Sequence, residues 1–139
     1  MKLLTSIYLI FTISFYAAEY NIYIDADFSN YKESSVSIEM GVKTALEIES
    51  KKLQNHQINI IRMDHKANSR RSLKNLKKIT TDPNCLAVLS GIHSPPVLAN
   101  KKFINTNKIL FFSPWAAAGP ITRADRGDEN WIFRLSVDD

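Results

Sequence analysis

The sequence is poor in cysteine. Among 139 residues the single cysteine is Cys85, so neither an intrachain disulfide, a cysteine-rich zinc module nor a CxxC redox pair can form. A strong excess of one charge is also absent, because 18 basic and 14 acidic residues leave a net charge of +4, which is weak support for a polyanionic partner. With 45% hydrophobic and 23% charged residues, the composition is that of one globular domain and excludes disordered, collagen-like and coiled-coil chains.

The sequence strings that mark common enzymes are missing as well. No HExxH, GxGxxG, P-loop or GxSxG string occurs, and His56, His65 and His93 are too scattered for a helical metal pair. Asp25 and Asp27 alternate at the end of a predicted strand, a spacing that suits paired carboxylates, but acids at strand ends normally cap or solvate loops. We therefore expect no catalytic residue, no metal and no cofactor, and predict that the protein is not an enzyme.

The longest apolar run is short and lies at the amino terminus. After a positively charged start, Leu3–Tyr16 is apolar and is followed by Ala17 and Ala18. This run of about 14 residues falls short of the roughly 20 that a membrane-spanning helix needs. The pattern predicts a cleaved signal peptide over 1–18 and leaves the exact cleavage bond open, since bulky residues precede the two alanines. The mature chain, 19–139, is then expected in the periplasm or another extracytoplasmic compartment, without stable membrane insertion.

The rest of the chain alternates strand and helix patterns. Five apolar runs predict strands at Tyr20–Ile24, Gln57–Met63, Cys85–Leu89, Lys108–Phe112 and Trp131–Leu135. Amphipathic segments predict helices from Ser34 or Ser35 with a stripe from Ile38 to Glu49, from Ser69 or Ser72 to Thr80, and from Ser94, with Ser94 as the N-cap. This alternation indicates an α/β fold: a Rossmann-like, three-layer parallel sheet with helices on both faces. Ligands bind such sheets at the carboxyl ends of the strands.

A basic stripe marks the second predicted helix. It consists of Arg70, Arg71, Lys74, Lys77 and Lys78. Such a stripe could meet nucleic acid or anionic lipid, but no aromatic residues are interleaved with it. The pattern favours a solvated outer face, and we expect no nucleic-acid partner.

The order of several short motifs resembles a known family. Gly41–Leu46 follows the first strand, the second strand ends at Asp64, and Val88–Ser94, Ser113–Ala117 and Phe133–Arg134 follow. Behind an export signal, this order resembles the N-terminal lobe of type I periplasmic binding proteins, nearest to the leucine/isoleucine/valine-binding receptors of ABC transporters. The resemblance covers essentially the whole mature chain. It implies a non-enzymatic receptor that binds a small, amino-acid-like or related polar solute between two lobes and delivers it to an ABC permease in the inner membrane.

The resemblance also implies ligand-binding residues. It places Ile92, His93 and Ser94 at a loop and helix N-terminus that hold the ligand's carboxylate, and Trp115, Ala116 and Ala117 on a second ligand-binding loop. A helix N-terminus offers free N–H groups and the positive end of the helix dipole to an anion. Simpler roles stay open beside these: Ser94 as a plain N-cap, His93 as a surface loop residue and Trp115 as a packing residue.

This sequence departs from the family pattern at three places. Ala117 stands where the family usually has a hydroxyl, Pro95–Pro96 lack backbone N–H groups, and Ser34 stands where the family often has an aromatic residue. The first two of these changes reduce the number of hydrogen-bond donors that the site can offer to an anion. Our hypothesis is therefore that the ligand is flatter or less anionic than a free aliphatic amino acid, with Trp115 stacking on it and His93 donating a hydrogen bond.

The length of the chain also differs from that of the family. Removing the predicted signal leaves about 121 residues, enough for most of one lobe, whereas the family's receptors are roughly three times longer. We therefore expect an incomplete lobe, a fragment of a receptor, that binds ligand weakly or not at all on its own. The alternative is the ligand-binding ectodomain of a membrane sensor with the same fold. An exported enzyme would need a nucleophile and a base, for which the sequence offers no candidates.

Overall fold

The computed structural model describes residues 17–123 and 129–137. The predicted signal segment 1–18 lies outside these ranges except for Ala17 and Ala18, and Ala18 is already the first residue of β1. The elements in chain order are β1 (Ala18–Ala26), α1 (Lys32–Ile48), β2 (His56–Asp64), α2 (Ser69–Ile79), β3 (Cys85–Ser90), α3 (Ser94–Thr106), β4 (Phe111–Ser113), the short 3₁₀ helix η1 (Gly119–Ile121) and β5 (Ile132–Arg134). The predicted order of strands and helices is confirmed.

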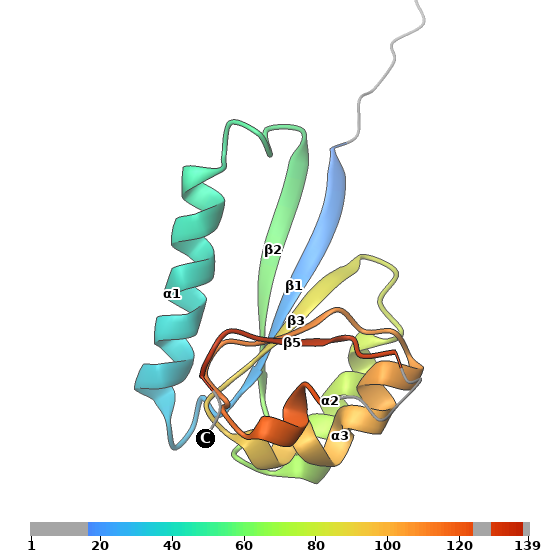
Figure 1. Ribbon diagram of the computed structural model, residues 1–139. Helices are drawn as coiled ribbons and strands as arrows, with labels where there is room; N and C mark the ends of the chain where they lie inside the picture. The colour runs from blue at the N-terminus through green and yellow to red at the C-terminus, as the bar shows by residue number, and fades with distance from the viewer. Residues whose placement is uncertain (1–16, 124–128, 138–139) are drawn as a thin grey trace, which may run out of the picture.

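The strands form one parallel sheet in the order β2-β1-β3-β4-β5. Figure 1 shows α1 on one side of this sheet and α2 with α3 on the other. The expected three-layer α/β architecture is therefore confirmed. None of the helices in the described residues is long and apolar enough to cross a membrane.

The hydrophobic core lies between the sheet and the pair α2 and α3. Because side chains alternate along a strand, one residue of each adjacent pair faces these helices. Val88, Phe111 and Ile132 point into this layer, each at most 2% exposed. They pack against buried residues of the two helices, namely Leu76, Ile79, Val97 and Ile104. The five basic residues of α2 all face solvent, as the amphipathic pattern predicts.

In the opposite layer, made by α1, the fully buried helix residues are polar. In α1 the buried residues are Ser35 and Glu39, while the predicted apolar stripe from Ile38 to Glu49 is half-buried or exposed. Glu39 is 5% exposed, and its carboxylate accepts a hydrogen bond from Arg62 Nε of β2 at 2.5 Å. Gly41 has no neighbouring heavy atom within 4 Å of an added Cβ, so the outer flank of α1 is uncovered. The stripe marks the helix correctly, but its burial depends on tertiary neighbours.

Helix starts differ in detail from the expectation. The first helix begins at Lys32, before Ser34 and Ser35, and neither serine caps it. Instead Ser34 Oγ donates to the Tyr31 carbonyl and Ser35 Oγ donates to the Asp27 carbonyl. Serine hydroxyls in a first turn can bond either to free N–H groups or to nearby carbonyls, and the loop geometry decides between the two.

Candidate functional site

A hollow of about 520 Å³ opens at the carboxyl ends of the strands, where the fold class predicts a ligand. Its lining includes Asn30 and Tyr31 of the β1–α1 loop, Ser34 and Ser37 of α1, and Trp115 of the loop after β4. Tyr31 is 51% exposed and Trp115 is 52% exposed. Two further hollows, one between α2 and α3 and one at the amino-terminal end of the sheet, contain none of the predicted site residues.

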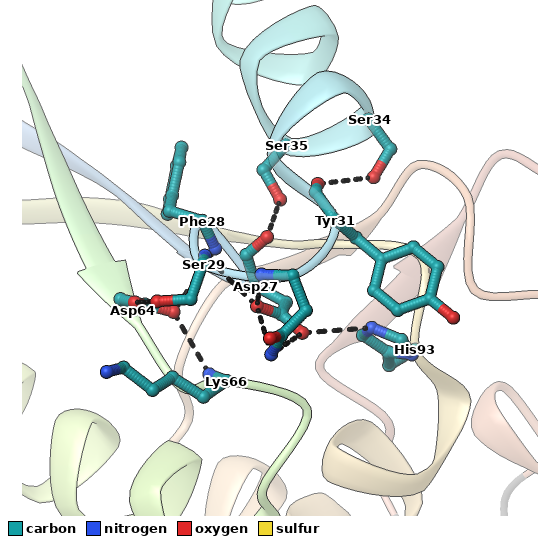
Figure 2. A network of polar contacts seen from close by, with 10 residues as sticks. Asp27, Phe28, Ser29, Tyr31, Ser34, Ser35, Asp64, Lys66 and His93 are labelled. Carbon is teal, nitrogen blue, oxygen red and sulfur yellow. Dashed lines mark hydrogen bonds and ion pairs between the residues drawn. The ribbon is translucent and has the colours of Figure 1, made fainter.

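Two aspartates fix the β1–α1 loop that forms one side of this hollow. Asp64 Oδ1 accepts from the backbone N–H of Phe28 at 3.1 Å, and Asp27 Oδ1 accepts from the next two N–H groups, those of Ser29 at 3.1 Å and Asn30 at 2.8 Å. The Ser29 hydroxyl also donates to Asp64. Figure 2 shows these contacts, with the loop folded over both carboxylates. Consecutive loop amides are thus satisfied by acids at the ends of neighbouring strands.

The same contacts keep both aspartates ionised. Burial raises the pKa of Asp27, but hydrogen bonds from Asn30 and Ser29 outweigh it and the pKa lies below its ordinary value. Burial also raises the pKa of Asp64, and hydrogen bonds from Ser29, Lys66 and Phe28 again bring it below the ordinary value. Both acids act as loop anchors, which is the expected role for Asp27. Asp25, for which the same role was expected, is buried and instead accepts hydrogen bonds from Ser72 and Asn75 of α2.

Two histidines lie under the loop. His93 Nε2 is 3.5 Å from Asp27 Oδ2, and the His93 ring meets the Tyr31 ring edge-on at 4.7 Å between centroids. His65 is 1% exposed, with its ring centroid 6.1 Å from that of His93. Burial, and then the neighbouring His93, lower the pKa of His65, so its ring is neutral at pH 7. Neither His65 Nδ1 nor His93 Nε2 has a hydrogen-bond partner among the described residues, so His93 and Asp27 are close neighbours that are not hydrogen-bonded.

The segment after β3 carries the first three predicted site residues. It starts at Gly91, where an added Cβ would lie 2.9 Å from Ala26 Cβ, so only glycine allows the ends of β1 and β3 to approach this closely. Ile92, His93 and Ser94 follow, each half-buried. The expectation that Ser94 is the N-cap of α3 is wrong: the cap position is His93, which makes no side-chain capping bond. Ser94 Oγ instead accepts from the Ala118 N–H at 3.2 Å, because the loop after β4 lies beside it.

The loop after β4 carries the other three predicted residues. Trp115 projects to solvent along the hollow, whereas Ala116 is fully buried in the core and Ala117 is half-buried. The Ala116 carbonyl accepts from Ser113 Oγ at 3.2 Å and from Ser136 Oγ at 3.1 Å. The loop is therefore held by its backbone, and Trp115 is its exposed side chain at the hollow.

The structure brings some predicted residues together and adds others. Trp115 faces the same hollow as Tyr31, and His93 supports Tyr31 from behind. Sequence reasoning did not identify Tyr31 or Asn30 as site residues. The available signal was the position of Tyr31 in the loop after the first strand. The family often has an aromatic residue in this loop at the position of Ser34, and Tyr31 lies three residues before it.

The described residues also limit the chemistry of the site. Within 17–123 and 129–137, no group of three or more His, Cys, Asp or Glu side chains is arranged to hold a metal ion. The hollow combines two aromatic side chains with hydroxyl and amide groups and with one residue of each charge, Lys32 and Glu33. Such a surface suits the binding of a small flat molecule with a polar end.

No protein-family model and no curated protein matches the sequence. Solved structures do match the fold. They include an R. palustris ABC-transporter solute-binding protein in complex with benzoate (TM-score 0.75, 20% identity, 87% of this chain and 33% of that chain). A periplasmic binding protein type 1 from Bordetella pertussis (0.72, 18%, 85% and 34%) and a leucine-binding protein from Thermotoga maritima (0.71, 15%, 86% and 33%) are also similar. This chain spans about a third of the length of each. The chain therefore has the fold of one lobe of a type I periplasmic binding protein.

Proposed function

We propose that this chain is the solute-binding N-terminal lobe, or part of it, of an extracytoplasmic receptor that serves an ABC permease. The observation that carries the proposal is the hollow at the carboxyl ends of the strands, flanked by exposed Tyr31 and Trp115. Two exposed aromatic side chains that line one hollow at the ligand-binding end of a parallel sheet favour a binding role. In this proposal a second lobe closes over the hollow and completes the site.

The proposed solute is a small planar carboxylate. Among the similar structures, three from R. palustris are complexes with benzoate, 4-hydroxybenzoate and 3,4-dihydroxybenzoic acid, and one from Desulfitobacterium hafniense is a complex with leucine. For this chain, two aromatic rings beside the hollow favour a flat solute over an aliphatic one. Trp115 would stack on the solute. Residues 92–94 do not line the hollow itself, and of these Ser94 would bind the polar end of a solute that extends beyond it. Because Ser94 Oγ already accepts from Ala118, its hydroxyl proton is available to the solute.

The proposed compartment follows from the amino-terminal sequence. Residues 1–18 would direct export and be removed, and 19–139 would act in the periplasm. Delivery of the solute to a permease in the inner membrane completes the proposed transport role. The absence of catalytic strings in the sequence agrees with binding rather than chemistry.

A titration followed by NMR tests this proposal. The chain has two tryptophans, Trp115 at the hollow and Trp131 at the amino-terminal end of the sheet, and each gives one indole N–H resonance. If two lobes contributed equally to a dissociation constant of about 1 μM, one lobe alone would bind at about 1 mM. Benzoate added to several times that concentration should shift the Trp115 resonance and leave the Trp131 resonance in place.

Matched variants make the test specific. Trp131→Phe identifies the Trp115 resonance and should bind benzoate like the wild type, whereas in Trp115→Phe the shifts that benzoate causes in the Tyr31 ring resonances should be mostly lost. Leucine, titrated in parallel, should bind more weakly than benzoate. Equal movement of both indole resonances, or none with either solute, would contradict the proposed function.

A further inference from the structure

Asp27 is the buried centre of the polar network below the hollow. Its side chain is 0% exposed, and its two oxygens receive the N–H groups of Ser29 and Asn30 together with the Asn30 side-chain amide. A carboxylate taken out of water is stable only when its oxygens are well satisfied. Asp27 therefore fixes the loop backbone immediately before Tyr31.

His93 connects this carboxylate to the Tyr31 ring. Its Nε2 lies 3.5 Å from Asp27 Oδ2, and its ring packs against Tyr31 with the two planes at 86°. Figure 2 shows Asp27, His93 and Tyr31 in succession, with the tyrosine ring at the outer end. An edge-on aromatic pair is stabilised beyond its buried area, which favours one position of an exposed ring. Asp27 thus fixes the backbone just before Tyr31, and the Tyr31 ring packs on the histidine that lies beside Asp27.

We infer that Asp27 and His93 are positioning residues that set the Tyr31 ring as one wall of the binding hollow. This inference rests on the proposed function, because the position of the Tyr31 ring affects binding only if the hollow binds a solute. His93 then acts on the solute through Tyr31, while its Nε2, 3.5 Å from Asp27 Oδ2, makes no hydrogen bond among the described residues. When the Tyr31 ring is fixed before the solute arrives, less conformational entropy is lost on binding.

The first test needs no ligand and uses the 139-residue chain. In Asp27→Asn, we expect the Asn30 amide to exchange its hydrogen about tenfold faster and the nuclear Overhauser effect between the Tyr31 and His93 rings to weaken severalfold. Asp64→Asn is the matched control: it should speed exchange at Phe28 and leave the Tyr31–His93 effect unchanged. An unchanged ring-to-ring effect in Asp27→Asn would overturn the inference.

A second variant guards against misfolding of the first. His93→Phe keeps an aromatic ring beside Tyr31 but removes the nitrogen that faces Asp27, while the loop hydrogen bonds to Asp27 remain. We expect the Tyr31 ring resonances to broaden or shift in this variant while those of Trp131 stay in place. Resonances of Tyr31 identical to those of the wild type would count against the positioning role of His93.

Benzoate affinity then connects the positioning to the site. Asp27→Asn and His93→Phe should each weaken benzoate binding about threefold to tenfold, by the Trp115 indole titration, whereas Asp64→Asn should change it less. If the ring contact is lost and the affinity is unchanged, the wall has no role in binding and the inference fails. If the wild type itself binds no benzoate, the proposed function fails, and the ring-to-ring measurement still decides whether Asp27 positions Tyr31.

Discussion

Phe112 and Phe133 are register partners in the parallel pairing of β4 with β5, and their rings lie 5.8 Å apart. Their strand neighbours Phe111 and Ile132 face the core, so this pair faces the side of the sheet away from α2 and α3. Phe133 is 49% exposed and Leu135, two residues later, is 75% exposed. This part of the sheet therefore presents an apolar surface to solvent.

We expect this surface to cause self-association of the chain. Replacing Phe133 and Leu135 by lysine should lower the associated fraction, because charged side chains resist desolvation in an interface. Sedimentation velocity over a range of concentrations measures it. Ile48→Lys, at the far end of α1 and 73% exposed, is the matched control and should change little. Equal effects of the two changes would argue against this surface as the cause.

A buried acid between β1 and α2 predicts a pH dependence of stability. Burial raises the pKa of Asp25 to about 6, despite hydrogen bonds from Ser72 and Asn75 that lower it. Its unfolded value is near 3.8. Between these values the native state binds the extra proton, so the contribution of Asp25 to stability is complete below pH 3.8 and declines as pH rises toward 6.

The matched variant is Asp25→Asn, which retains partners for Ser72 and Asn75. Urea unfolding at several pH values measures the free energy of unfolding of both proteins. From pH 3.8 to pH 6 this free energy should rise in the variant relative to the wild type by up to about 3 kcal/mol, and above pH 6 the difference should stay constant. A difference that does not change with pH would show that Asp25 ionises alike in the native and unfolded states.

The hydrogen bond from Arg62 of β2 to Glu39 of α1 is expected to stabilise the packing of α1 on the sheet. Hydrogen bonding to Arg62 is the main cause that holds the pKa of Glu39 below its usual value. Arg62→Met should cost about 1 to 2 kcal/mol, since it leaves a buried carboxylate with Lys43 alone, and the 51% exposure of Arg62 moderates the loss. Adding Glu39→Met should recover much of that loss in urea unfolding. A double variant as unstable as the sum of both single variants would exclude this coupling.

Ser94 predicts a link between α3 and the loop that carries Trp115. Its hydroxyl oxygen accepts from the Ala118 N–H, so Ser94→Ala should cost about 1 kcal/mol and speed hydrogen exchange at Ala118. Thr80→Ala, which removes an exposed hydroxyl bonded to the Lys77 carbonyl, is a control that should leave Ala118 unaffected. Unchanged exchange at Ala118 in Ser94→Ala would mean that this contact contributes nothing to the loop.

Much of the fold could be predicted because its signals are local. Apolar runs such as Cys85–Leu89 and the turn at Asp82–Asn84 gave strand and helix positions to within a few residues. Helix caps were less predictable, as Ser94 shows, because its hydroxyl had a choice between the amides of its own helix and that of Ala118 on another loop. The partner of such a hydroxyl depends on which loop lies beside it in the folded protein.

The candidate site could be predicted only by region. Its place at the carboxyl ends of the strands follows from parallel topology, and Trp115 was identified from its loop. Tyr31 could not be paired with Trp115 from the sequence, because their proximity depends on how β1 and β4 are spaced in the sheet. The roles of Ile92, His93, Ser94, Trp115, Ala116 and Ala117 in ligand binding stay predictions.

The sequence by itself determined the alternation of strands and helices, the parallel sheet and the edge at which a ligand would bind, because periodicity and turn residues act over a few residues. Tertiary structure alone decided that Asp27, His93 and Tyr31 lie together, and that the stripe of α1 is at most half-buried. Such contacts depend on the packing of segments far apart in the chain, where distance and burial, not local pattern, determine which partners meet.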